Sequence, residues 1–162
     1  MKLALKWSLP ITVAAMAIAW LSEQAAPFCG LDPSPQPLVE LFTNPSVAIA
    51  EKVKWAAFAV LVAPVIEEFL FRMCLFNLFR WTGRKILQSG RSGAFPWASA
   101  VLSGAVFAAI HFHAVTFPAL LFLGAAFAWL YWKSGTIASP MLCHCIFNSV
   151  NLALCLSMAL FS

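Results

Sequence analysis

Charged residues are scarce in this sequence. They make up 10% of the 162 residues, with ten Lys and Arg side chains against six Asp and Glu. Hydrophobic residues supply 62%, and the mean hydropathy is +0.87. This composition is too apolar for a soluble domain of such a size. It therefore excludes a soluble globular domain and predicts an all-α polytopic membrane protein.

The chain also lacks the features of a modular or nucleic-acid-binding protein. It contains no linker and no internal repeat, so residues 1–162 are predicted to form a single membrane-embedded domain. The basic residues are spread thinly between apolar runs, which argues against a nucleic-acid partner despite the formal net charge of +4. The five cysteines are odd in number and lie mostly in apolar runs, so no disulfide framework is predicted.

Long apolar runs predict a compact bundle of about five transmembrane helices with a polar site inside. The expected helices span 3–21, 47–79, 94–112, 117–132 and 137–161. Residues 22–46 hold five prolines and three acids, which predicts an extramembrane loop. Residues 3–21 also fit a cleaved signal peptide, but no small-x-small cleavage site follows them, so a retained first helix is favoured.

Seven of the ten basic residues fall on one side of this predicted order of helices, and the acidic loop falls on the other. By the positive-inside rule the basic side is cytoplasmic, so the N-terminus is expected there. Four of these residues are assigned to a short loop after the second helix. The seven residues on the basic side are Lys2, Lys6, Arg80, Arg84, Lys85, Arg91 and Lys133.

Two adjacent carboxylates, Glu67 and Glu68, lie inside a long apolar run. An ionised side chain at bilayer depth costs at least about 2.5–3.5 kcal/mol, so such a pair indicates function. Helical spacing puts Glu68 and Arg72 on one face, with the acid before the base, which is the better order for pairing. Glu67 lies about 100° round the helix and is free to meet water or substrate. A purely structural ion-pair cluster is the alternative.

Pro64 lies three residues before Glu67, in a predicted helix that is longer than a membrane requires. The stretch Trp55–Phe79 would extend about 37 Å, against a hydrocarbon core of about 30 Å. The helix must therefore tilt or bend at Pro64. Because proline removes a helical hydrogen bond, Pro64 can also expose backbone and admit water near Glu67, with a plain kink as the alternative.

Further polar side chains occur in the predicted membrane segments. His111 lies near the end of the third helix, and Phe107 stands one turn before it, where its ring can pack against the imidazole. His144 and Asn148 are one turn apart on the fifth helix, so both project from one face. A lone intramembrane His usually serves helix packing, but two His, one Asn and two Glu on three helices predict an active site.

Motifs of other intramembrane hydrolases are absent or weak. The sequence has no His-Glu-x-x-His zinc helix and no Gly-x-Gly-Asp motif. Cys143 and Cys145 flank His144, but on a helix they point about 200° apart and do not share a metal ion. Ser103 beside Gly104 leaves a serine route open, although small pairs of this kind are common in helix packing.

The polar residues fall into three motifs in order along the chain. They are Glu67-Glu68-Phe69-Leu70-Phe71-Arg72, Phe107-Ala108-Ala109-Ile110-His111 and His144-Cys145-Ile146-Phe147-Asn148. Together these motifs resemble those of the type II CAAX prenyl endopeptidases, the CPBP or Abi family of intramembrane proteases. The resemblance covers roughly residues 55–155.

The resemblance implies an endopeptidase that hydrolyses a peptide bond near the end of a membrane-anchored protein, with C-terminal sorting tails as candidate substrates. It implies Glu67 as the general base on water, helped by His111. It implies that His144 and Asn148 stabilise the oxyanion. The remaining motif residues are implied to orient and support the site: Glu68, Arg72 and Phe107. A non-catalytic membrane scaffold or a bacteriocin-immunity module that retains the polar cluster is the alternative function.

Location, partners and cofactor follow from the same resemblance. Eukaryotic relatives have more helices than the five expected here, which favours a small bacterial member in the inner membrane, with a bacterial protein tail rather than a prenylated peptide as substrate. The expected partners are a membrane-anchored protein or peptide and the lipid bilayer. No metal is expected, because Arg72 already supplies positive charge beside the acids. Zinc is the alternative, since two His and two Glu are able to ligate it.

Overall fold

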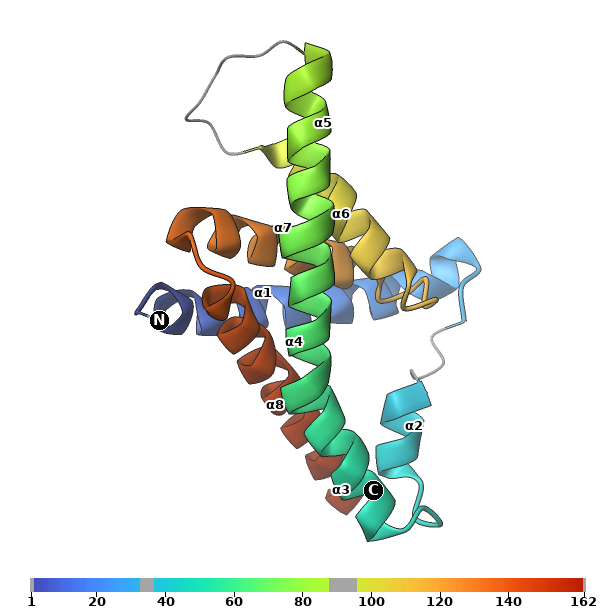
Figure 1. Cartoon of the computed structure of the whole chain (residues 1–162). Coiled ribbons are helices and arrows are strands. Elements are labelled where there is room, and N and C mark those ends of the chain that lie inside the picture. Colours follow the sequence, from blue (N-terminus) through green and yellow to red (C-terminus); the bar gives the residue numbers. More distant parts are fainter. Residues whose placement is uncertain (1, 33–36, 88–95, 162) are drawn as a thin grey trace.

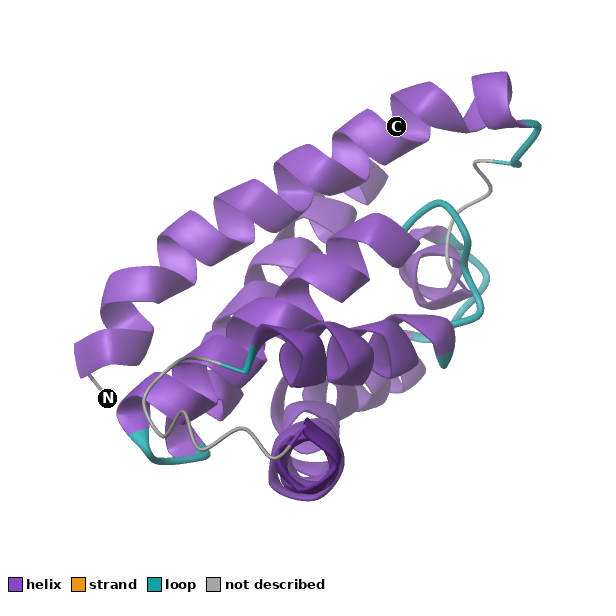
Figure 2. Cartoon of the chain, turned by 90° about the horizontal axis from the view of Figure 1, so that it is seen from above, coloured by secondary structure: helices purple, strands orange, loops and turns teal. Residues whose placement is uncertain are grey.

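The computed structural model describes residues 2–32, 37–87 and 96–161, and its regular elements are all helices. This confirms the all-α prediction for the described part of the chain (Figures 1 and 2). The α-helices are α1 (Lys2–Ala25), α2 (Pro37–Thr43), α3 (Ile49–Ala57), α4 (Ala63–Glu68), α5 (Asn77–Leu87), α6 (Trp97–Ala109), α7 (Phe117–Ser134) and α8 (Ala138–Phe161). A 3₁₀ turn, η1 (Ala26–Cys29), follows α1.

Helices α3, α4 and α5 form one continuous helix, because two π-helical segments join them: η2 (Phe58–Val62) and η3 (Phe69–Phe76). This long helix runs down the centre of Figure 1. Its irregular segment η2 ends two residues before Pro64, so the backbone departs from α-geometry where the sequence predicted. The proline ring would clash with the carbonyl of residue 60 in a regular α-helix, which explains the wider turn there.

The predicted end of this helix at residue 79 is wrong. Arg80, Arg84 and Lys85 lie on α5 rather than in a loop, and the Lys85 Nζ atom lies 4.0 Å from the centre of the Trp81 ring. A rise in polarity marks the end of an apolar segment, but it does not interrupt backbone hydrogen bonding, so the helix continues past it. Arg91 lies outside the described residues.

The other predicted ranges agree with the structure to different degrees. The ranges 117–132 and 137–161 correspond closely to α7 and α8. The range 3–21 is too short by four residues at its C-terminal end. The predicted loop 22–46 contains the end of α1, η1 and the short helix α2, whose Phe42 is buried and whose Phe42 carbonyl accepts a hydrogen bond from Lys52 Nζ at 2.9 Å. The range 94–112 is too long, because α6 ends at Ala109.

Two described helical stretches are long and apolar enough to cross a membrane: Lys2–Cys29 and Ala138–Ser157. Helix α6 is apolar but has 13 residues, α7 ends in aromatic residues and Lys133, and the π-helical segments divide the long helix. The prediction of about five transmembrane helices is therefore not confirmed by length and composition.

Two packing contacts place the helices that carry the polar residues. Helices α1, α7 and α8 share a core of Ile11, Ala15, Leu123, Phe127, Leu130 and Cys143. Helices α6 and α7 cross closely at two glycines: a Cβ atom on Gly124 would lie 2.5 Å from the Gly104 Cα atom. Only glycine allows two backbones to approach so closely. The crossing fixes the position of α6, which carries Phe107.

Candidate active site

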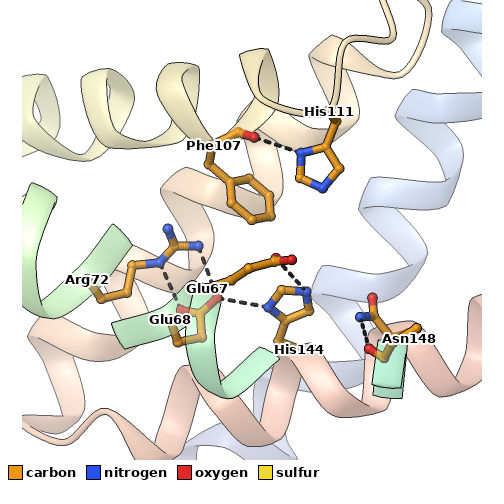
Figure 3. A network of polar contacts seen from close by, with 8 residues as sticks. Glu67, Glu68, Arg72, Phe107, His111, His144 and Asn148 are labelled. Carbon is orange, nitrogen blue, oxygen red and sulfur yellow. Dashed lines mark hydrogen bonds and ion pairs between the residues drawn. The ribbon is translucent and has the colours of Figure 1, made fainter. Parts of the chain in front are cut away.

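Glu68 and Arg72 form a buried ion pair at the junction of α4 and η3 (Figure 3). The Arg72 Nε atom lies 2.9 Å from Glu68 Oε2, and Arg72 Nη2 donates a hydrogen bond to Glu68 Oε1 at 3.2 Å. Both side chains are fully buried. The pairing predicted from their spacing is therefore present, and each charge neutralises the other in a place where a single charge would be costly.

Three aromatic rings surround the Arg72 guanidinium. Its Cζ atom lies 5.9, 5.2 and 5.6 Å from the ring centres of Phe71, Phe107 and Phe127. The Arg72 Nη1 atom has no hydrogen-bond acceptor among the described residues. Cation–π attraction by the aromatic rings stabilises this part of the guanidinium. Phe107 thus contacts Arg72 as well as His111.

His144 connects the buried ion pair to the second carboxylate. Its Nδ1 atom lies 2.9 Å from Glu68 Oε1, and its Nε2 atom lies 3.7 Å from Glu67 Oε2. Because Glu68 is a carboxylate that faces Arg72, Nδ1 carries a hydrogen and donates it. The ring stacks on Phe127 with 5.0 Å between centroids, which fixes its plane. Nε2 is therefore aimed at Glu67 (Figure 3).

Glu67 differs from its neighbour in exposure. Its side chain is 25% exposed, whereas that of Glu68 is fully buried. The two carboxylates point in different directions because successive residues of a helix are about 100° apart. The structure thus separates a paired acid from an accessible acid, as the sequence predicted.

His111 lies just beyond the end of α6 rather than inside a helix. The His111 and Phe112 N–H groups close a tight turn on the carbonyls of Ala108 and Ala109, and Phe112 has a φ of 50°. The His111 Nδ1 atom lies 2.8 Å from the Phe107 carbonyl oxygen. A carbonyl only accepts, so Nδ1 carries the hydrogen and Nε2 of the neutral ring has a free lone pair. The Phe107 and His111 rings pack edge to face at 4.9 Å, which confirms their predicted contact.

Asn148 lies one turn beyond His144 on α8, and its side chain reaches the long helix. Its Nδ2 atom donates a hydrogen bond to the Ala59 carbonyl oxygen at 2.7 Å. Ala59 belongs to the π-helical segment η2. The amide therefore bonds to a backbone group, a contact that the motif spacing does not predict.

A cavity of about 590 Å³ opens beside these groups. Most of its other lining is apolar and comes from α1, α2, the long helix, α7 and α8, including Met16 and Leu152. Two predicted site residues, Glu68 and Arg72, lie behind this lining rather than in it. The five that line the cavity are Glu67, Phe107, His111, His144 and Asn148.

The alternative nucleophile and metal sites gain no support from the geometry. Ser103 Oγ is fully buried and donates a hydrogen bond to the Phe71 carbonyl at 2.8 Å, away from the cavity lining. Cys143 is buried in the core shared by α1, α7 and α8. In the described ranges, no group of three or more His, Cys, Asp or Glu side chains is arranged to hold a metal ion. Whether the reaction needs a metal stays a separate prediction.

Sequence reasoning missed two components of the site. Phe127 stacks on His144 and contacts Arg72, but it lies in an apolar helix with no distinguishing pattern. The Ala59 carbonyl is a backbone group, so the identity of residue 59 does not predict its contact. The sequence feature closest to it is Pro64, which removes a backbone donor about one turn later.

One comparison with known proteins gives a family match that spans all three motifs. The type II CAAX prenyl endopeptidase Rce1-like family matches residues 49–150, which is more than half of the chain and includes every motif residue. Searches of curated proteins and of solved structures give no match. Members of this protease family are membrane proteins, in agreement with the two long apolar helices. The chain belongs to the type II CAAX prenyl endopeptidase Rce1-like family.

Proposed function

We propose that this protein is an intramembrane endopeptidase in which Glu67 activates the attacking water. The observation that carries the proposal is the unequal placement of the two acids. Glu68 is fully buried and bound by Arg72, whereas Glu67 lines the cavity beside His144 Nε2. A general base must reach the water that it deprotonates, and Glu67 is the acid of the pair that meets this condition.

A charge balance assigns the protons. Arg72 and Glu68 cancel each other, and His144 donates its Nδ1 hydrogen to Glu68. The Glu67 carboxylate lies 3.7 Å from Nε2, so the proposal places one further proton on this pair of groups, where the two opposite charges balance. When that proton is on Nε2, Glu67 is a carboxylate that can accept a proton, and Nε2 is a donor.

The reaction follows from this arrangement. The water oxygen attacks the peptide carbonyl carbon while one water proton passes to Glu67, and the carbonyl electron pair moves to the oxygen. The resulting oxyanion accepts a hydrogen bond from His144 Nε2, which is the kind of donor that lowers such barriers most. When the carbon–nitrogen bond breaks, Glu67 returns its proton to the leaving amine. The free lone pair on His111 Nε2 accepts a hydrogen bond from the attacking water and orients it.

The cavity lining favours cleavage within a chain. A permanently charged Lys or Arg is the typical partner for the terminal carboxylate that a carboxypeptidase binds. Among the described residues that line the cavity there is no Lys or Arg, while Glu23 and Glu67 are both acidic. The apolar walls suit a membrane-anchored segment, so we propose a bacterial protein tail, such as a C-terminal sorting tail, as the substrate class.

The proposed setting is the bacterial inner membrane, with the N-terminus on the cytoplasmic side. The distribution of basic residues supports this orientation. The proposal includes no metal, because Arg72 already supplies the positive charge that stabilises the buried acid.

The test compares wild type with Glu67→Gln, which keeps the shape of the side chain and removes the base. Mass spectrometry of membrane-protein termini from cells that express each form should show new termini with wild type that are lost with Glu67→Gln. Glu51→Gln is the matched control, because Glu51 is a half-exposed acid on α3 of the same long helix and does not line the cavity. Identical termini with wild type and Glu67→Gln would instead support a scaffold or an immunity module.

A further inference from the structure

The backbone of the long helix lacks one hydrogen-bond donor near the site. In the π-helical segment η2, the Ala63 N–H group bonds to the Phe58 carbonyl, five residues back. The next carbonyl, that of Ala59, would pair in the same register with the nitrogen of residue 64. That residue is proline and has no N–H group. The Ala59 carbonyl is therefore left without a helical donor.

A side chain from another helix supplies the missing donor. Asn148 Nδ2 on α8 lies 2.7 Å from the Ala59 oxygen, and the bond is partly buried. A backbone carbonyl without a partner is costly in an apolar environment, where no water compensates it. We propose that Asn148 is a positioning residue that replaces the N–H group missing from Pro64 and so fixes the segment that carries Glu67.

The second π-helical segment uses the same kind of contact. In η3, the Phe71 carbonyl accepts a hydrogen bond from Ser103 Oγ at 2.8 Å, and the Met73 carbonyl accepts one from Asn77 Nδ2 at 3.0 Å. Side chains thus donate hydrogen bonds to backbone carbonyl groups in both irregular segments. Among these contacts, the Asn148 bond differs because proline at position 64 explains the missing backbone donor.

The contact matters to the site because of where it lies. Ala59 lies before Glu67 in the long helix, and Glu68 lies directly after Glu67. Asn148 bonds Ala59 to α8, and His144 bonds Glu68 to α8. These two bonds hold α8 against the long helix on either side of Glu67, which fixes the distance between Glu67 and His144 Nε2. This step rests on the proposed function, whereas the bond itself does not.

A double-mutant cycle tests the inference, because Pro64→Ala restores a backbone N–H group. The four proteins are wild type, Asn148→Ala, Pro64→Ala and the double variant, purified in detergent. Thermal unfolding and kcat for a membrane-tethered peptide are measured for each. We expect Asn148→Ala to lower kcat at least about tenfold with Pro64 present, and less than about threefold in the Pro64→Ala background. The loss of thermal stability should shrink in parallel.

Pro10→Ala controls for a general benefit of removing a proline, since Pro10 is an exposed proline inside α1. It should not rescue Asn148→Ala. The inference is overturned if Asn148→Ala is equally harmful with either residue at position 64, which would make Asn148 a direct contact of the substrate. It is also overturned if Asn148→Ala is harmless. If wild type cleaves nothing but the stability cycle shows coupling, the proposed function fails while the Asn148–Pro64 relation stands.

Discussion

The close crossing of α6 and α7 allows a quantitative prediction for Gly124→Ala. A Cβ atom at this position would lie 2.5 Å from the Gly104 Cα atom. Carbon atoms in contact are normally about 3.5–4.0 Å apart, so the helices must separate by about 1 Å. Overpacking of this kind costs about 1–3 kcal/mol. For a protein of this size, each kcal/mol lowers Tm by about 2–4 °C, so we expect a fall of about 2–12 °C.

The same displacement should reach the site, because α6 carries Phe107 at the centre of the cluster around Arg72. Activity should therefore fall together with Tm, when both are measured on detergent-purified protein. Gly83→Ala is the control. Nothing lies within 4 Å of a Cβ atom at Gly83 on α5, and replacing a helical glycine by alanine stabilises by about 0.5–1 kcal/mol. A Gly124→Ala protein as stable as wild type would refute the reasoning.

Two further predictions concern charge. Arg72→Met should lower the free energy of unfolding by about 3–5 kcal/mol, because the buried Glu68 carboxylate loses its guanidinium partner and keeps only the hydrogen bond from His144. Adding Glu68→Gln should recover most of that loss in thermal unfolding. Equal losses for the single and double variants would contradict a mutual neutralisation. Elemental analysis of active purified protein should find no stoichiometric metal, and activity should survive a chelator. One zinc per chain, with activity lost to the chelator and restored by zinc, would overturn the metal-free proposal.

Under the proposed mechanism, the arrangement of the site separates supporting residues from reacting ones. Arg72, Glu68 and Phe127 lie behind the cavity and fix the plane and the tautomer of His144. Glu67 and His111 face the cavity and are free to meet water. A buried ion pair contributes little net stability, but here it determines which nitrogen of His144 is aimed at Glu67.

Sequence alone determined several features of this protein. Apolar composition predicted the all-α class, since a backbone in lipid must satisfy its own hydrogen bonds. The spacing of Glu68 and Arg72 predicted their pairing, and that of Phe107 and His111 predicted their ring contact, because both relations are local to one helical turn. The end of the long helix was mispredicted, because polarity marks a membrane boundary and not the end of a helix.

Only the tertiary structure decided the contacts between helices. His144 bonds to Glu68 across 76 residues of chain, and Asn148 bonds to Ala59 across 89. No local pattern encodes such pairs, because they depend on how α8 crosses the long helix. The π-helical segments likewise depend on the tertiary structure, because side chains of α6 and α8 bond to backbone carbonyl groups within them. The sequence determined which polar residues the helices carry, and the crossing of the helices determined which of them face the cavity and which hold the others in place.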